Sequence, residues 1–233
     1  MDHRAGGQRR AHHFLQRLPG AVELHRAGFK MAFFQDENFS YDIPRVEKIC
    51  HLILEHNLKM RFAFQGTIHH LPESVFQLMH RAGFDALFVG VESGSDAQLR
   101  RYGKPGTRKT LAEGIRRAKR AHMLVVGFFV YGGPGETDQD FEATQKFIQE
   151  VRPHICGGSA LSIQPQAILW DKLIGEAEPL TLEDSHPRQM YTIAGQHDNE
   201  SIRRWRRGLR QAFSKSWRNW RRITDILDLL RFN

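Results

Sequence analysis

Residues 125–136 read VVGFFVYGGPGE, a continuous apolar run that ends directly in a glycine-rich turn. Two other stretches have the same form, because FKMAFF at 29–34 leads into QDEN and ALFVGV at 86–91 leads into ESGS. A strand that is buried on both faces of a parallel sheet has such an uninterrupted apolar sequence. Since ligands gather where parallel strands end, the three turns predict one shared small-molecule pocket.

Helix and strand signals alternate between Leu24 and Gln164. Expected strands begin near residues 29, 60, 85, 124 and 158. This alternation predicts an α/β fold with a parallel sheet and right-handed crossovers, either barrel-like or doubly wound. Asn57 is expected to end a helix in the left-handed conformation. The repeated segment HRAGF, at 25–29 and 80–84, predicts the same joint of helix, glycine and strand twice.

The net charge of +8 is concentrated near the end of the 233-residue chain. Nine Lys or Arg and no acid lie between Ser201 and Arg222, whereas residues 1–200 hold 24 basic and 24 acidic residues. Cys50 and Cys156 form no paired-thiol motif, which favours a reducing compartment. Since neither a signal-peptide stretch nor a membrane span is apparent, we expect a cytoplasmic protein.

Carboxylates follow each of the three apolar runs. Asp36, Glu37, Glu92 and Glu136 are expected on one rim, where they could bind cations, share a proton or accept hydrogen bonds. Any one of them could instead cap a helix. A hydrolase or lyase with Asp36 or Glu37 and Glu92 as acid and base is one alternative. The absence of a Walker loop and of a dinucleotide fingerprint disfavours nucleoside-triphosphate and nicotinamide enzymes.

Taken together, residues 33–165 resemble the radical S-adenosylmethionine (radical SAM) superfamily, in particular the branch often fused to a cobalamin-binding domain. The motifs that carry the resemblance are DENF at 36–39, GVESGS at 90–95 and GFFVYGGPGET at 127–137. The resemblance implies a partial (β/α)6 TIM-like barrel, here without its first strand. It also implies S-adenosylmethionine, a 4Fe–4S cluster and, in full-length relatives, cobalamin as cofactors.

The same resemblance implies which residues bind S-adenosylmethionine. The backbone of Gln35, Asp36 and Glu37 would face its methionine amino group. Glu92, with Ser93 beside it, would reach the ribose and methionine part, and the run from Phe128 through Val130 to Gly132 would lie against the adenine. Catalytic residues stay unassigned.

The chain departs from the family at the cluster. The family holds its cluster with three cysteines in a Cys-x3-Cys-x2-Cys loop, and thiolates are the ligands that such a cluster needs. This sequence has only Cys50 and Cys156, 106 positions apart. We therefore expect a truncated or degenerate member, inactive alone, and favour truncation. A non-catalytic cofactor-binding or nucleic-acid-binding protein is the second alternative.

Histidines and the basic tail complete the expectations. None of the 13 histidines has metal-ligand spacing, so no metal ligand is assigned. Between Ile202 and Leu227, apolar residues recur at helical spacing among the arginines, which suits packing on the barrel or contact with RNA or an anionic surface. The expected domains are a poorly ordered basic N-terminus (1–23), the barrel (24–175) and a C-terminal extension with amphipathic helices (176–233).

Overall fold

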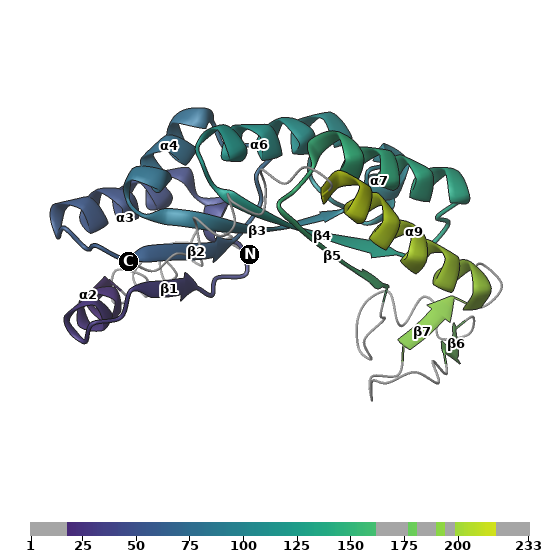
Figure 1. The fold of residues 1–233 in the computed structure, drawn as a ribbon, viewed down its shortest axis with the longest axis horizontal. Helices are drawn as coiled ribbons and strands as arrows, with labels where there is room; N and C mark the ends of the chain where they lie inside the picture. Colours follow the sequence, from purple (N-terminus) through teal and green to yellow (C-terminus); the bar gives the residue numbers. More distant parts are fainter. Residues whose placement is uncertain (1–17, 162–176, 181–189, 194–198, 218–233) are drawn as a thin grey trace, which may run out of the picture. The chain divides into compact units, whose positions relative to one another are not determined.

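The computed structural model describes residues 18–161, 177–180, 190–193 and 199–217 of the chain. Helices and strands alternate along most of it, as Figure 1 shows. The strands are β1 (Met31–Phe34), β2 (Arg61–Gln65), β3 (Phe84–Glu92), β4 (Leu124–Tyr131), β5 (Ile155–Ala160), β6 (Ala177–Leu180) and β7 (Met190–Ile193). The helices are α2 (Leu18–Arg26), η1 (Phe39–Tyr41), α3 (Ile43–Glu55), α4 (Glu73–Arg81), α5 (Asp96–Arg101), α6 (Arg108–Arg120), α7 (Asp138–Val151) and α9 (Asn199–Trp217).

Five strands form one sheet in the order β1-β2-β3-β4-β5, and β6 pairs with β7 in antiparallel fashion. The pairs β1–β2, β2–β3 and β4–β5 are parallel. The predicted α/β fold with a parallel sheet is therefore confirmed. By its internal contacts the chain divides into two units, one with the described residues up to Val89 and Gly114–Val125, the other with Gly90–Glu113 and the described residues from Val126 onward.

Phenylalanines form the core of the first unit. The rings of Phe34, Phe39, Phe62, Phe64 and Phe84 pack with centroids 4.8 to 5.7 Å apart. These rings come from three strands and from the turn after β1, so their burial fixes where that turn begins. Asp42 caps the next helix, since its carboxylate accepts the backbone N–H of Arg45 at the start of α3.

Left-handed residues end the helices where the sequence predicts them. Asn57 follows α3 with φ of 49°. Gly28 (φ 86°) and Gly83 (φ 91°) occupy the same place in the two HRAGF segments. A Cβ on Gly83 would also meet the carbonyl oxygen of Met60. Both the conformation and the available space therefore require glycine at this joint.

In the second unit, α9 packs on α7 and β5 (Figure 1). Ile202, Trp205 and Leu209 of α9 are buried. The Trp205 ring stacks on Phe141 of α7, with centroids 5.2 Å apart and planes 10° apart. The expected packing of this stripe is confirmed as far as Ala212, which is also buried, and Phe213 is half-buried; residues after Trp217 lie outside the described part.

Two boundaries differ from expectation. β5 begins at Ile155 instead of Gly158, because β4 pairs with this segment from Val126 onward despite its two glycines. The short helix α5 was not predicted; Ser95 is its N-cap, and the Ser95 hydroxyl accepts the N–H of Gln98. No helix within the described ranges combines the length and hydropathy that a membrane span needs.

Candidate functional site

β3 ends in an unusual backbone conformation. Glu92, the last residue of the strand, has φ of 65°, a left-handed conformation that is uncommon for a residue other than glycine. Its carboxylate lies 2.9 Å from the Nζ of Lys104, which follows α5. The carboxylate folds over Gly90, where a Cβ would also lie 3.2 Å from Lys104 Nζ. Strain of this kind persists where the surroundings dictate it and is frequent at functional sites.

Buried hydroxyls fix the turn that follows β3. The Ser93 side chain is fully buried, and its Oγ lies 3.1 Å from Oγ1 of Thr144 on α7. Thr144 Oγ1 also accepts the backbone N–H of Gly94 at 2.9 Å. A Cβ on Gly94 would lie 2.7 Å from Thr144 Cα, so only glycine allows α7 this close. Ser93, predicted as a cofactor ligand, thus helps to shape the turn, and its contact with a cofactor stays a prediction.

An acid and an arginine connect α5 to α7. The Asp140 carboxylate accepts hydrogen bonds from the Ser95 hydroxyl and from Arg101 Nη1, the latter at 3.1 Å. It also accepts the N–H of Thr137 and so completes the capping box at the start of α7. Burial alone would raise the pKa of Asp140, but these hydrogen bonds outweigh it and lower the pKa. Asp140 is therefore a charged anchor between the second and third motifs.

β4 carries the predicted adenine-facing run. Phe128 is 43% exposed, Val130 is half-buried, and Gly132 has φ of 76°. An exposed phenyl ring on the strand, with a glycine directly after the strand's end, offers a surface on which a flat apolar group can lie. Ile202 of α9 approaches Gly132 closely enough that a Cβ there would lie 2.6 Å from its Cδ1.

The last residue of the GGPGE turn is a buried acid. Glu136 Oε2 accepts the N–H of Gly133 at 3.1 Å and closes the turn. Burial raises the pKa of Glu136 to about 7, although the N–H groups of Gly133 and Gly132 oppose the shift. A carboxyl with this pKa changes charge near neutrality.

The first unit holds the predicted residues Gln35, Asp36 and Glu37 in the turn after β1. Gln35 and Glu37 are exposed. Asp36 is half-buried and forms an ion pair with Arg45 Nη2 at 3.0 Å. The Arg45 guanidinium also donates to the carbonyl oxygen of Phe39 at 3.2 Å. The Asp36 side chain therefore holds the turn to α3.

Polar side chains join this turn to the one after β2. Asn38 Oδ1 accepts the N–H of Thr67 at 3.0 Å, and Ser40 Oγ donates to the Thr67 carbonyl at 2.6 Å. Glu92, Ser93, Phe128, Val130 and Gly132 belong to the second unit and Gln35, Asp36 and Glu37 to the first. Whether all eight residues contact one ligand stays a prediction.

Lys104 is the functional candidate that the sequence interpretation missed. Its charge reaches Glu92 because α5 turns the chain back between the two residues. Two residues could have indicated a short helix before Lys104. Ser95 is a typical N-cap residue, and Gly103 can end a helix in the left-handed conformation. A six-residue helix between them returns the chain to the turn after β3.

The residues present do not fit a 4Fe–4S cluster. Within the described ranges no three His, Cys, Asp or Glu side chains could hold a metal ion together. Cys50 and Cys156 lie in different units, and burial raises the pKa of both thiols to about 12. Neither is therefore the thiolate that iron ligation requires.

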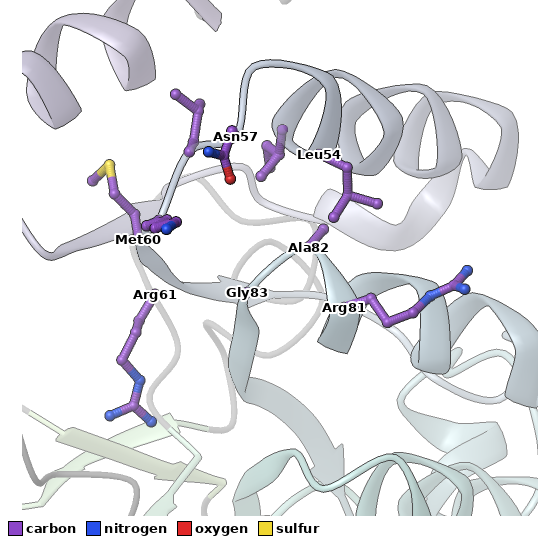
Figure 2. A pocket seen from close by; sticks show the side chains of 10 residues that line it. Leu54, Asn57, Met60, Arg61, Arg81, Ala82 and Gly83 are labelled. Atoms are coloured by element: carbon purple, nitrogen blue, oxygen red, sulfur yellow. The ribbon is translucent and has the colours of Figure 1, made fainter.

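A cavity of about 310 Å³ lies in the first unit, where α3 and α4 end and β2 begins. Figure 2 shows that the side chains of Arg61 and Arg81 point in different directions from it. Arg61 is also paired with Asp85. The cavity thus lacks convergent polar groups, and we assign it no function.

Strand ends with acidic and glycine-rich turns define an α/β protein of the cofactor-binding barrel class. The family model described as "Radical SAM superfamily" matches residues 8–148, more than half of the chain. The chain therefore belongs to the radical SAM superfamily, and the resemblance inferred from its three motifs is confirmed.

Individual relatives agree with this assignment. An uncharacterised methyltransferase of Pyrococcus horikoshii is 25% identical over 178 residues, which cover 76% of this chain and 39% of that protein. A tRNA-2-methylthio-N(6)-dimethylallyladenosine synthase of Aeromonas hydrophila subsp. hydrophila is 42% identical over 67 residues, covering 28% of this chain and 14% of that protein. The chain thus spans less than two fifths of the length of these curated relatives.

A solved structure shares the fold. The radical SAM methyltransferase TsrM from Kitasatospora setae, with cobalamin and a [4Fe-4S] cluster bound, superposes with a TM-score of 0.64 at 14% identity, covering 82% of this chain and 40% of that chain. The predicted partial TIM-like barrel fold is confirmed.

Proposed function

We propose that this chain is the S-adenosylmethionine-binding core of a radical SAM enzyme. One observation carries the proposal: Glu92, in a left-handed conformation within the GVESGS motif, holds its carboxylate 2.9 Å from the Lys104 ammonium. S-adenosylmethionine has an amino-acid end with both charges and a ribose with two hydroxyls. A carboxylate and an ammonium side by side complement these groups.

Each partner has a distinct role in this proposal. Lys104 would bind the methionine carboxylate, exchanging part of its contact with Glu92 for the ligand. Glu92 would accept hydrogen bonds from the ribose hydroxyls. Phe128 would offer an apolar face to the adenine, and the turn from Gln35 to Glu37 would meet the methionine amino group.

Radical chemistry needs an electron that a 4Fe–4S cluster supplies in the family. Because the chain's own cysteines do not fit a cluster, we propose that it is inactive alone, as a truncated or degenerate member. Its residues would bind and orient the cofactor and exclude water from it. The two free, buried or half-buried cysteines support a reducing, cytoplasmic compartment.

The ion pairs also bear on the hydrolase alternative. A general acid and base need carboxyls that are free to exchange protons with a substrate. Asp36 is instead paired with Arg45 and Glu92 with Lys104. These pairings favour cofactor binding over acid–base hydrolysis.

The test is the affinity of the intact chain for S-adenosylmethionine, measured by isothermal titration calorimetry. We expect Glu92→Gln to weaken binding about tenfold, because a charged acceptor is lost. Glu142→Gln is the matched control, since Glu142 is an exposed glutamate of the same unit, on α7. Equal affinities of Glu92→Gln and wild type, with both folded, would overturn the proposal.

A second candidate function is RNA contact through α9. Arg203, Arg206, Arg207 and Arg210 are exposed, and no ion pair holds any of them within the described part of the chain. Arg204 differs, because it pairs with Asp138 at 2.8 Å. Exposed arginines on a helix whose other face is packed complement a phosphate backbone. The relative from Aeromonas hydrophila is named for a tRNA product, which agrees with this candidate.

Changing these four arginines to glutamine should abolish binding to a labelled tRNA in a filter-binding assay. The wild-type affinity should fall steeply with salt, because phosphate contacts release counterions. Arg152→Gln, on an exposed site outside α9, is the control. Salt-insensitive binding would contradict the candidate, as would binding to anionic phosphatidylserine vesicles in place of tRNA.

A further inference from the structure

Buried polar groups surround the backbone of Gly133 in the second unit. Gln98 of α5 is fully buried, and Glu136 is only 4% exposed. A Cβ on Gly133 would lie 2.6 Å from Gln98 Nε2 and would collide with the hydroxyl of Tyr102. Gly133 therefore allows α5 and the residue after it to close directly on the GGPGE turn.

Glu136 holds this turn from the inside. Its Oε2 accepts the Gly133 N–H at 3.1 Å, and its backbone N–H donates to the Gly133 carbonyl at 3.1 Å. The N–H of Gly132 also interacts with the carboxyl. Because Gly132 directly follows β4, the position of the Glu136 side chain fixes the path by which the strand ends.

Three polar atoms are buried together around the turn. They are Gln98 Nε2, Tyr102 Oη and Glu136 Oε1. The Gln98 side chain interacts with the Tyr102 hydroxyl and lowers its pKa, and the Glu136 charge acts on the same hydroxyl. An amide donor, a hydroxyl and a carboxyl oxygen are mutually complementary, so the three side chains can hold the turn against α5.

We propose that Gln98 and Tyr102 are positioning residues that, with Glu136, clamp the 132–136 turn and so set the cofactor-facing backbone of Gly132. The assignment of the ligand rests on the proposed function, whereas the clamp itself does not. Neither residue is expected to touch the cofactor.

Several charged groups surround Glu136. Asp140 raises its pKa and Arg101 lowers it, in addition to the dominant effect of burial. Tyr102 keeps its proton, because burial and then the Glu136 charge raise the pKa of its hydroxyl. Glu92 also acts on Tyr102, but its charge is shared with Lys104.

The clamp should therefore depend on pH. Above about pH 7 the Glu136 carboxylate is charged, and the N–H groups of Gly133 and Gly132 bond more strongly to the charged form, which is why they lower its pKa. Tyr102, which keeps its proton, can then donate to Oε1. Below this pH the carboxyl carries its proton and accepts the two N–H groups less strongly. The clamp is thus tight in the charged state and loosens as the pH falls through the pKa of Glu136.

The clamp can be measured without a ligand, from the hydrogen-exchange protection factors of the Gly132 and Gly133 amides in the intact chain. In the wild type, protection should be higher at pH 8 than at pH 6. Glu136→Gln keeps an uncharged acceptor, so its protection should be the same at both pH values. Tyr102→Phe should lower protection at pH 8 about 5- to 10-fold, the effect of one buried hydrogen bond. Tyr41→Phe is the control, because Tyr41 is 79% exposed.

The comparison separates the clamp from the proposed function and from general destabilisation. Altered protection confined to 132–133 supports the clamp even if no S-adenosylmethionine binds, a result that contradicts only the proposed function. When the cofactor does bind, Tyr102→Phe should weaken it about 5- to 10-fold. The clamp is overturned if wild-type protection is independent of pH, or if Tyr102→Phe lowers protection equally in β2.

Discussion

Glu92 and Lys104 form an ion pair of 2.9 Å although α5 lies between them in the sequence. The pair combines a left-handed acid from the GVESGS motif with a lysine that no motif contained. It gives the turn after β3 both an acceptor and a donor of fixed position. Several consequences of this arrangement and of its surroundings can be measured.

Lys104→Met should weaken S-adenosylmethionine binding about tenfold, because a charge-assisted hydrogen bond to the methionine carboxylate is lost. Binding of 5′-methylthioadenosine, which has no amino-acid end, should stay within about twofold of wild type. Calorimetric titration of both ligands makes the comparison, with Lys109→Met as the exposed-lysine control. Equal losses for the two ligands would show that Lys104 does not recognise the carboxylate.

Arg45→Met should lower the free energy of unfolding by roughly 1–3 kcal/mol, since it leaves the half-buried Asp36 carboxylate and the Phe39 carbonyl without their donor. Urea denaturation measures the loss. Arg45→Lys restores the charge without the planar fork and should recover only part of the stability. An unchanged midpoint in Arg45→Met would mean that this ion pair does not hold the turn after β1.

Gly94→Ala should destabilise the protein by roughly 1–3 kcal/mol, because its Cβ would lie 2.5 Å from Phe147 Cβ and 2.7 Å from the Ala143 carbonyl oxygen. Gly20→Ala is the matched control, as nothing lies within 4 Å of its added methyl group. Thermal unfolding of the two variants can be compared directly. A Gly94→Ala variant as stable as Gly20→Ala would contradict the close packing of α7 on this turn.

Trp205→Ala should lower the free energy of unfolding by roughly 3–5 kcal/mol, because a buried ring stacked on Phe141 is removed. Trp205→Phe keeps an aromatic ring and loses the 2.7 Å hydrogen bond to Asp138, so its loss should be smaller. Urea denaturation followed by circular dichroism distinguishes them. Little loss in Trp205→Ala would contradict the packing of α9.

Local sequence rules predicted the framework well. Asn57, Gly28 and Gly83 were expected in left-handed positions and are found there, because a helix end and its stop depend on neighbouring residues. The β5 start was misplaced, since the pairing of Ile155 with Val126 depends on a distant strand. Strand propensity alone also argues against a strand that contains Gly157 and Gly158.

The candidate site was less accessible to sequence reasoning. The family motifs identify Glu92, but its partner Lys104 depends on the unpredicted helix α5. Gln98 and Tyr102 were missed for the same reason. Asp36 was assigned to a cofactor-binding rim, and its pairing with Arg45 depends on how the turn packs against α3. Side-chain partners across such turns are set by tertiary structure, which residue spacing does not report.

The most direct test of the account is equilibrium dialysis of the intact, folded chain against radiolabelled S-adenosylmethionine. The account predicts saturable binding of one cofactor per chain, displaced by unlabelled S-adenosylhomocysteine. The absence of saturable binding at cofactor concentrations up to about 1 mM, where even weak specific binding is detectable, would contradict it.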